Sequence, residues 1–526
     1  MKNLKITTAV FMLSGSLLIT SCRSSDNAVD NSGENLITNG SALIKMNLLG
    51  SEYESETIST QASAKHTNSY SVVKEQVSTF MAGEQPVIAT LTPVSVISTQ
   101  ASVNPIAAVV RNPLKGPNVK YRVIAYRTST GAKVATSVYT IDSNGNSTAD
   151  NGEMMLDGDN ETVNKYDFVV LSYNSSTAPA DVTGSISTAT LPSISGDNDL
   201  MYFRTNNVRV SKGDNVLNIL LTHKFSQITT VIDASAVAPG TPISSIGSGI
   251  VLDNHRRNGN SIALSTGVVS FGGTPATKSV SFTPPTPTSA IWTSNPTLIA
   301  NPGISATDMS TLIFPDSAAG AITVGTKSKR NFSVNNLVVT PGVKYNLKLK
   351  FACTADATPT WPFNMSDSGS GTRLTRTFNA PAADAGFVFD IYELDNSFNM
   401  TINGVDLATQ EIQFQSGVDS YPRNIWFKSD KKQWGDPGIP QIYSLGSSTN
   451  TTPIIRITIG PDGSVSMMGR RTISSGLEPL ELYGGTRFNT VTWKTTGSNT
   501  VDATMLVTGA TVMRGLGVGK KIIACP

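Results

Sequence analysis

The stretch Tyr166-Asp-Phe-Val-Val-Leu-Ser-Tyr173 decides the fold class of this chain. It is rich in β-branched and aromatic residues, which favour a pleated and partly buried strand. Similar stretches lie at residues 86–91, 121–126 and 133–141, and turn residues such as Asp142-Ser-Asn-Gly145 separate them. Short strands with regular turn signals, and no convincing long amphipathic helix, predict an all-β fold built of β-sandwiches.

Two further β-rich units are expected downstream. Residues 215–223 and 225–233 form a nearly continuous extended stretch, which we interpret as the passage from a first sandwich to a second. Residues 354–385 break this pattern with Pro, Ser, Gly and Asn, and a jelly-roll-like unit is expected after them. The predicted organisation is a signal peptide at 1–22, a flexible tether at 23–38, sandwiches at 39–222 and 223–352, and a C-terminal β-rich domain at 353–526.

The N-terminus indicates export. Met-Lys-Asn-Leu-Lys5 is basic, and the apolar run that follows it is too short for a permanent membrane span. Ile19-Thr20-Ser21-Cys22 fits the lipobox pattern of bacterial lipoproteins, in which the cysteine becomes the lipidated first residue of the mature protein. The alternative is an ordinary signal peptide whose cysteine is incidental. We expect lipidation at Cys22, and hence attachment to a membrane through acyl chains.

The composition excludes some classes of partner. Hydrophobic residues make up 39% and charged residues only 15% of the 526 residues. The net charge of +2 gives no sign of a nucleic-acid-binding surface. After the signal, no apolar run approaches the length of a membrane span.

Three cysteines are present, Cys22, Cys353 and Cys525. If Cys22 carries lipid, two remain, and an exported chain meets oxidising conditions. We therefore expect a disulfide between Cys353 and Cys525, which would frame the third unit at both ends. The alternative is two free or buried thiols.

Several stretches resemble the fimbrillin-like proteins of Bacteroidota, which are related to type V pilus subunits. They are Tyr121-Arg-Val-Ile-Ala-Tyr126 with Gly131-Ala-Lys-Val134, Tyr166 to Asn174, Leu220-Leu-Thr-His-Lys-Phe-Ser-Gln-Ile-Thr-Thr-Val231 and Val339-Thr-Pro-Gly-Val-Lys-Tyr-Asn-Leu347. The lipobox followed by a polar tether is similar too. The resemblance covers about residues 36 to 352, and the third unit lies outside it.

The resemblance implies two transthyretin-like β-sandwiches, export as a lipoprotein and a place at the cell surface or in a fimbrium. In polymerising members of the family a protease removes the N-terminal strand, and a strand of a neighbouring subunit fills the groove. Here that strand would be residues 41–49. Lys65 is a possible processing site, but the family's arginine is missing, and we expect the strand to stay uncut. The pinned C-terminus predicts a terminal, anchor or accessory component rather than a stalk subunit.

The third unit contains candidates for ligand binding. Carbohydrate-binding sandwiches use aromatic faces for sugar rings and Asp or Asn for their hydroxyl groups. The candidates here are Asp395, Asn396, Asn399, Trp434 and Asp436. The alternative is structural: Asp395 and Asn396 would form a turn. Trp426, within Asn-Ile-Trp-Phe-Lys428, is expected in the core.

No motif predicts an enzyme, a metal site or a cofactor. Of the three histidines, His223 is interpreted as structural and His255 as a solvated turn residue. Gly515-Leu-Gly-Val-Gly519 lacks the features of a phosphate-binding loop and is expected to form a turn or bulge near the last strand.

Two functional hypotheses follow. The first is a lipid-anchored, fimbrillin-like protein of the outer membrane that acts in adhesion or in pilus assembly, with other pilus subunits as partners. The second is a surface glycan-binding lipoprotein that assists polysaccharide uptake.

Overall fold

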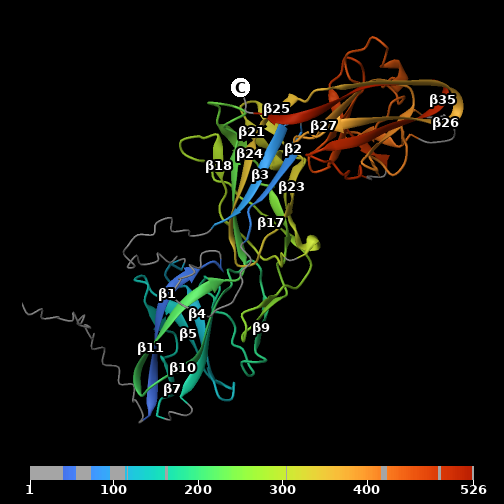
Figure 1. Ribbon diagram of the computed structural model, residues 1–526. Coiled ribbons are helices and arrows are strands. Elements are labelled where there is room, and N and C mark those ends of the chain that lie inside the picture. Colours follow the sequence, from blue (N-terminus) through green and yellow to red (C-terminus); the bar gives the residue numbers. More distant parts are fainter. Residues whose placement is uncertain are drawn as a thin grey trace, which may run out of the picture.

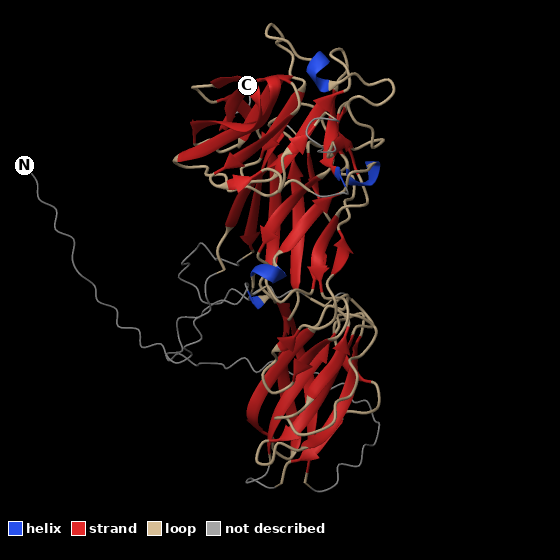
Figure 2. Cartoon of the chain, turned by 90° about the vertical axis from the view of Figure 1, so that its right-hand side faces the viewer, coloured by secondary structure: helices blue, strands red, loops and turns tan. Residues whose placement is uncertain are grey.

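The computed structural model describes residues 40–54, 73–83, 85–94, 113–114, 116–159, 164–303, 305–415, 423–483 and 487–523. Strands dominate these residues, and the helices among them are the short 3-10 helices η2 (Ala306–Asp308), η3 (Ala318–Gly320) and η4 (Ile442–Ser444) (Figure 2). The prediction of an all-β fold is therefore confirmed. In the described part of the chain, no helix has the length and apolar character needed to cross a membrane.

The first unit is one eight-stranded sheet. Its strands, in spatial order, are β6 (Ser147–Ala149), β5 (Lys133–Ile141), β4 (Lys120–Arg127), β8 (Lys165–Ser172), β10 (Met201–Arg209), β11 (Gly213–His223), β1 (Ser41–Glu52) and β7 (Met154–Asp157). The sheet curls until β5 lies against β7, and its inner face encloses an apolar core. Ala42 and Ile44 of β1 point into that core, beside Tyr121 of β4 and Phe168 of β8.

The central strands β4 and β8 are buried on both faces. Val123 and Val170 lie in the inner core, whereas Ile124 and Val169 belong to a second apolar cluster on the outer face. A short sheet covers this outer face, made of β9 (Thr190–Ile194), β15 (Asn260–Ala263) and β16 (Val269–Ser270). Strands buried on both sides read as continuous apolar runs, which explains the stretch at 166–173.

The outer cluster joins the first unit to the second. It contains Leu191 and Leu200 from before the expected boundary at residue 222, and Phe225, Ile262 and Ala300 from after it. All five side chains are fully or almost fully buried. The passage from β11 to β12 (Ser226–Asp233) therefore lies inside a shared core and is not a linker between independent sandwiches.

The second unit packs two larger sheets around one core. The first sheet contains β18 (Ile291–Thr293), β12, β24 (Lys344–Phe351), β3 (Gln85–Pro93) and β2 (Gln76–Ala82), with β19 (Thr297–Ile299) also on β12. The second sheet contains β17 (Ala276–Ser279), β14 (Val251–His255), β20 (Ser310–Phe314) and β23 (Phe332–Leu337). A small sheet of β13 (Ile243–Ile246), β21 (Ile322–Val324) and β22 (Lys327–Lys329) completes the unit.

The hairpin of β2 and β3 corrects the predicted division of the chain. It was assigned with residues 39–222 to the first sandwich, but β3 pairs with β24 from Val87↔Phe351 to Pro93↔Tyr345. Phe80 and Leu91 accordingly lie in the core of the second unit. The chain thus passes from β1 into the second unit and returns to build the rest of the first.

The C-terminal unit is an eleven-stranded sheet that closes around its own core. Its strands are β25 (Cys353–Asp356), β26 (Trp361–Pro381), β27 (Phe387–Leu394), β28 (Ser397–Ile402), β29 (Val405–Asp406), β30 (Ile412–Gln413), β31 (Ile425–Phe427), β32 (Ile455–Ile459), β33 (Val465–Arg470), β34 (Leu477–Leu482) and β35 (Ser498–Ile523). Strand β35 pairs along its length with four other strands, β25, β26, β27 and β28.

The long ribbon of β26 and β35 bends in the middle (Figure 1). The register shifts between Ser370 and Thr372, and Gly371 and Gly509 at the bend have φ of 72° and 74°, a conformation that favours glycine. The two ends of β26 then meet, because Nε1 of Trp361 donates a hydrogen bond to the carbonyl of Asn379 at 3.1 Å.

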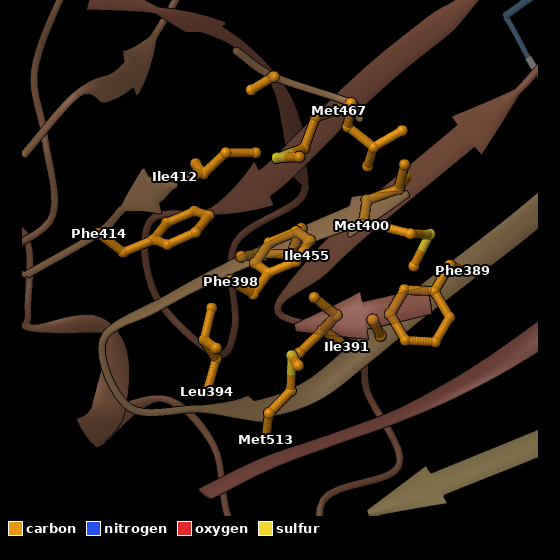
Figure 3. Close-up of a cluster of buried hydrophobic side chains, with 14 of the residues drawn as sticks. Phe389, Ile391, Leu394, Phe398, Met400, Ile412, Phe414, Ile455, Met467 and Met513 are labelled. Atoms are coloured by element: carbon orange, nitrogen blue, oxygen red, sulfur yellow. The ribbon is translucent and has the colours of Figure 1, made fainter. Parts of the chain in front are cut away.

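Glycines on β35 make room for the aromatic core. A Cβ on Gly517 would lie 2.5 Å from the ring of Phe387, and one on Gly515 would lie 2.8 Å from the ring of Phe389. Phe389 belongs to the buried cluster drawn in Figure 3, with Phe398, Phe414 and Met513. The prediction of a turn or bulge at 515–519 is wrong, because these residues form the interior of a strand.

The three units follow one another along a line. Strand β1 begins at Ser41, and just beyond its other end Glu54 bonds through its backbone N–H to the carbonyl of Gly342, at the start of β24. Strand β24 then leads through the single residue Ala352 into β25. Ser41 therefore lies at the opposite end of the molecule from the C-terminal unit (Figure 1).

The glycine spacing on β35 predicts that substitutions on its two faces affect stability very differently. Gly517→Val should lower the free energy of unfolding by about 1–3 kcal/mol, because the new side chain meets the Phe387 ring. Val518→Thr, on the opposite face, should change it by less than about 1 kcal/mol. Denaturant unfolding of both variants tests this. An equal effect at the two positions would contradict the packing.

Candidate ligand-binding surface of the C-terminal unit

The structure buries the tryptophan that the sequence placed at a ligand surface. Trp434 is 0% exposed, so neither face of its indole can stack on a sugar ring. Its ring packs against Phe427 at 4.7 Å and Phe414 at 5.5 Å between centroids, and its Nε1 donates to the carbonyl of Arg470 at 2.9 Å. The prediction that Trp434 binds a ligand is wrong, because the core of the C-terminal unit encloses it.

Asp436 holds the loop that carries Trp434. Its carboxylate accepts hydrogen bonds from the backbone N–H of Gln433 at 2.8 Å and from the guanidinium of Arg423 at 3.0 Å. The same guanidinium donates to the carbonyl of Trp434. Asp436 is thus part of a clamp that fixes the buried indole.

The other three predicted residues make hydrogen bonds within the sheet. Asp395 accepts from the N–H of Val512 at 2.7 Å, and burial raises the pKa of this carboxyl although that N–H bond lowers it. Asn396 donates to Thr508 Oγ1 at 2.6 Å, and Asn399 donates to the carbonyl of Ala408 at 2.9 Å. Asn396 and Asn399 are 3% and 7% exposed. These side chains therefore have structural roles, in agreement with the alternative to ligand binding.

Trp426, which was expected in the core, lies instead at the surface of the C-terminal unit. It is half-buried on β31, and its ring lies 4.9 Å from that of Tyr483, which is 62% exposed. The indole Nε1 donates to Glu481 Oε1 at 2.7 Å, which fixes the orientation of the ring. The ammonium of Lys431 lies 5.3 Å from the centre of the same ring and pairs with Glu481. We call Trp426, Lys431, Glu481 and Tyr483 the aromatic surface cluster.

The aromatic surface cluster has the chemistry of a carbohydrate or peptide contact. Aromatic rings supply apolar area at low entropic cost, and the charged pair beside them can donate and accept hydrogen bonds. The sequence contained a signal for the outward position of Trp426. Its neighbours Ile425 and Phe427 are apolar and, as the structure shows, both buried, so Trp426 between them faces the other side of the strand. Trp434 lies in a loop, where no such alternation applies.

The described histidines are buried and structural. Nδ1 of His223 contacts Asp199 Oδ1 at 2.6 Å, and the ring stacks on Tyr53 with centroids 4.0 Å apart. His255 is 0% exposed, which corrects the expectation of a solvated turn. Its Nδ1 accepts the N–H of Ala300 at 3.1 Å, so Nε2 carries the proton toward Asp197.

The pKa of His255 is lowered, because burial outweighs the neighbouring carboxylate of Asp197. Burial would raise the pKa of Asp197, but the hydrogen bond from Lys278 and the ion pairs with Lys278 and Arg257 lower it. The two groups therefore form a neutral imidazole beside an ionised carboxylate, an arrangement that serves packing between the first two units.

Several predicted sites lie at or beyond the limits of the described residues. Cys22, Lys65 and Cys525 are outside them. Cys353 is disulfide-bonded, and it stands opposite Ile523 in the register of β25 and β35. Pairing of Cys353 with Cys525 remains our prediction.

No family model matches this sequence, and no curated protein matches it. Solved structures with some likeness include a candidate cell adhesion protein from Bacteroides fragilis, with 11% identity, a TM-score of 0.31, and coverage of 59% of this chain and 96% of that one. A candidate polysaccharide-binding protein from Bacteroides thetaiotaomicron has 11% identity, a TM-score of 0.25, and coverage of 41% and 72%. The tip fimbrial protein Mfa3 from Porphyromonas gingivalis, with C-terminal truncation, has 11% identity, a TM-score of 0.25, and coverage of 44% and 92%. At these values the likenesses carry no assignment of function.

The assignment of Trp434 to the core and of Trp426 to the surface can be tested by measuring the free energy of unfolding. Trp434→Ala should lower the free energy of unfolding by about 3–5 kcal/mol, since it empties a fully buried site. Trp426→Ala should cost on the order of 1 kcal/mol, because its ring is partly solvated. Chemical denaturation monitored by circular dichroism measures both. A larger loss for Trp426→Ala would contradict the assignment.

Proposed function

We propose that this chain is a lipid-anchored, fimbrillin-like protein of the cell surface that presents its C-terminal unit for adhesion, as a terminal or accessory pilus component or on its own. The observation that carries the proposal is the linear order of the units. Ser41, which follows the expected tether, lies at the opposite end from the C-terminal unit (Figure 1). A lipid on Cys22 would then hold one end at the membrane and direct the other end outward.

The C-terminal strand supports a terminal or accessory place. A strand that is donated to a neighbour must leave its own subunit without unfolding it. Strand β35 pairs with four strands and supplies Val501, Ala503, Met505 and Met513 to the core. Its removal would open the whole unit. Filaments formed by the purified mature chain alone would contradict this role.

The N-terminal strand also supports an uncut chain. Ala42 and Ile44 of β1 are 0% and 1% exposed within the first core, and β1 pairs in parallel with β11 from Ala42 to Glu52. Loss of β1 would expose that core, so retention of the strand fits a chain that does not accept a neighbour's strand. Processing at Lys65 is the alternative.

Anchoring is tested at the cysteine itself. Cys22→Ser should release the protein from the membrane fraction of the native bacterium, because the acyl chains provide its attachment. Cys353→Ser is the matched control and should stay with the membrane. Fractionation followed by immunoblotting measures both. Continued membrane attachment of the Cys22→Ser protein, after a wash that removes peripheral proteins, would overturn the anchor.

The aromatic surface cluster favours a second candidate function, the binding of surface glycans. In affinity electrophoresis, gels containing soluble starch, xylan or laminarin should retard the mature protein if the cluster stacks on sugar rings. For a polysaccharide that retards the mature protein, the affinity should be at least about tenfold lower for Tyr483→Ala and for Trp426→Ala. Both variants should remain folded. Exposed Tyr443, which is 49% exposed on η4, provides the control variant Tyr443→Ala. Equal migration in all gels would reject glycan binding and leave the adhesive role.

A further inference from the structure

Strand β26 has one free edge. In the described part of the chain its partner is β35, over almost its full length of 21 residues, and no backbone hydrogen bond reaches its other edge. Residues 371–377 of β26 are exposed except for the half-buried Leu374. A strand edge of this kind presents unpaired N–H and C=O groups that can pair with another chain.

Two contacts on β35 show which groups of β26 face outward. The carbonyl of Thr500 accepts from the N–H of Asn403 at 2.9 Å, and the N–H of Thr500 donates to Asn403 Oδ1 at 3.0 Å. Thr500 therefore turns its backbone groups away from β26. Its partner across the ladder, Asn379, must point its own N–H and C=O to the free edge.

Backbone groups alternate along a strand, and the register runs without a shift from Thr372 to Pro381. The outward N–H and C=O groups are therefore those of Arg373, Thr375 and Thr377, together with Asn379. Two observations agree with this assignment. The carbonyl of Asn379 accepts the bond from Trp361, and Pro381, which lacks an N–H, stands at an outward position.

The side chains along this edge define the chemistry of an occupant. Leu374 and Phe378 are only partly buried and pack against the core of the C-terminal unit. The ring of Trp361 lies 5.9 Å from that of Phe378, so an added strand would cover Leu374. Arg373 and Arg376 are both exposed, and β26 carries no acidic residue between Ser368 and Pro381. Arg373 pairs with Glu411, whereas Arg376 makes no ion pair with the described residues.

We propose that the outer edge of β26, from Arg373 to Thr377, binds an extended segment of another protein, which adds to the sheet as an antiparallel or parallel strand. Leu374 and Arg376 point to the same face of β26, so the segment carries on one face an apolar residue beside Leu374 and, two positions away, a carboxylate beside Arg376. The edge belongs to the unit that the linear arrangement places farthest from Ser41. The inference does not depend on the lipid anchor.

The test uses the full mature chain and two fluorescein-labelled peptides, TVTETVT and TVTKTVT, in which the valines and the charged residue share one face. The acidic peptide should bind more tightly than the basic one. Thr375→Pro removes one outward N–H and leaves the ladder to β35 intact, so affinity should fall at least about tenfold, whereas Thr375→Val, which keeps the N–H, should stay within about twofold. Arg376→Glu should reverse the preference between the two peptides. Equal binding by Thr375→Pro would overturn the proposal.

Hydrogen exchange of the unmodified chain provides a second measurement that does not rely on a variant that folds. Without peptide, the amides of Arg373, Thr375 and Thr377 should exchange rapidly, and those of Leu374, Arg376 and Phe378 slowly. The acidic peptide should protect the first set. Unchanged exchange at saturating peptide would overturn the proposal. A dimer of the chain that is lost in Thr375→Pro would show a second copy at this edge and overturn the acidic segment as its occupant.

Discussion

The shared apolar core around Leu191, Phe225 and Ile262 fixes the direction of everything beyond it. These side chains are fully or almost fully buried, and they come from both sides of the passage between β11 and β12. Because burial of such residues requires close packing, the first two units cannot turn independently about that passage. The backbone bond between Glu54 and Gly342 adds a second connection at the same junction. The orientation of β24, and through Ala352 that of the C-terminal unit, follows from this constraint.

Much of the fold could be predicted, since alternating and continuous apolar runs identify strands directly. The order in which strands pair could not. Residues 76–93 form a good hairpin, but the sequence does not state that β3 will pair with β24, more than 250 residues later. Such long-range pairing depends on which apolar face remains uncovered once the other strands are in place. Similarly, the glycines at 515, 517 and 519 indicate a turn by local preference, whereas the rings of Phe389 and Phe387 require small residues at 515 and 517.

The site illustrates the same limit on a smaller scale. Trp434 stands among polar residues in the sequence and Trp426 between Ile425 and Phe427, and the structure reverses the places expected for them. Strand alternation around Ile425 and Phe427 could have identified Trp426 as outward-facing. For Trp434 no local pattern exists, because a loop holds it in the core through Arg423, Asp436 and the carbonyl of Arg470. Polar residues such as Asn396 and Asn399 look like ligand groups in a sequence, but a curved sheet needs them to satisfy its own backbone.

The parallel pairing of β1 with β11 has a mechanical consequence. The described chain enters the first unit at the start of β1, at Ser41, and the last strand of that unit, β11, ends at His223, at the far end of the same ladder. Under the proposed function, a pulling force between Ser41 and the distal unit would act on these two strands in opposite directions along their length. The hydrogen bonds between them would then bear the load together in shear, and would not open one after another as in a zipper.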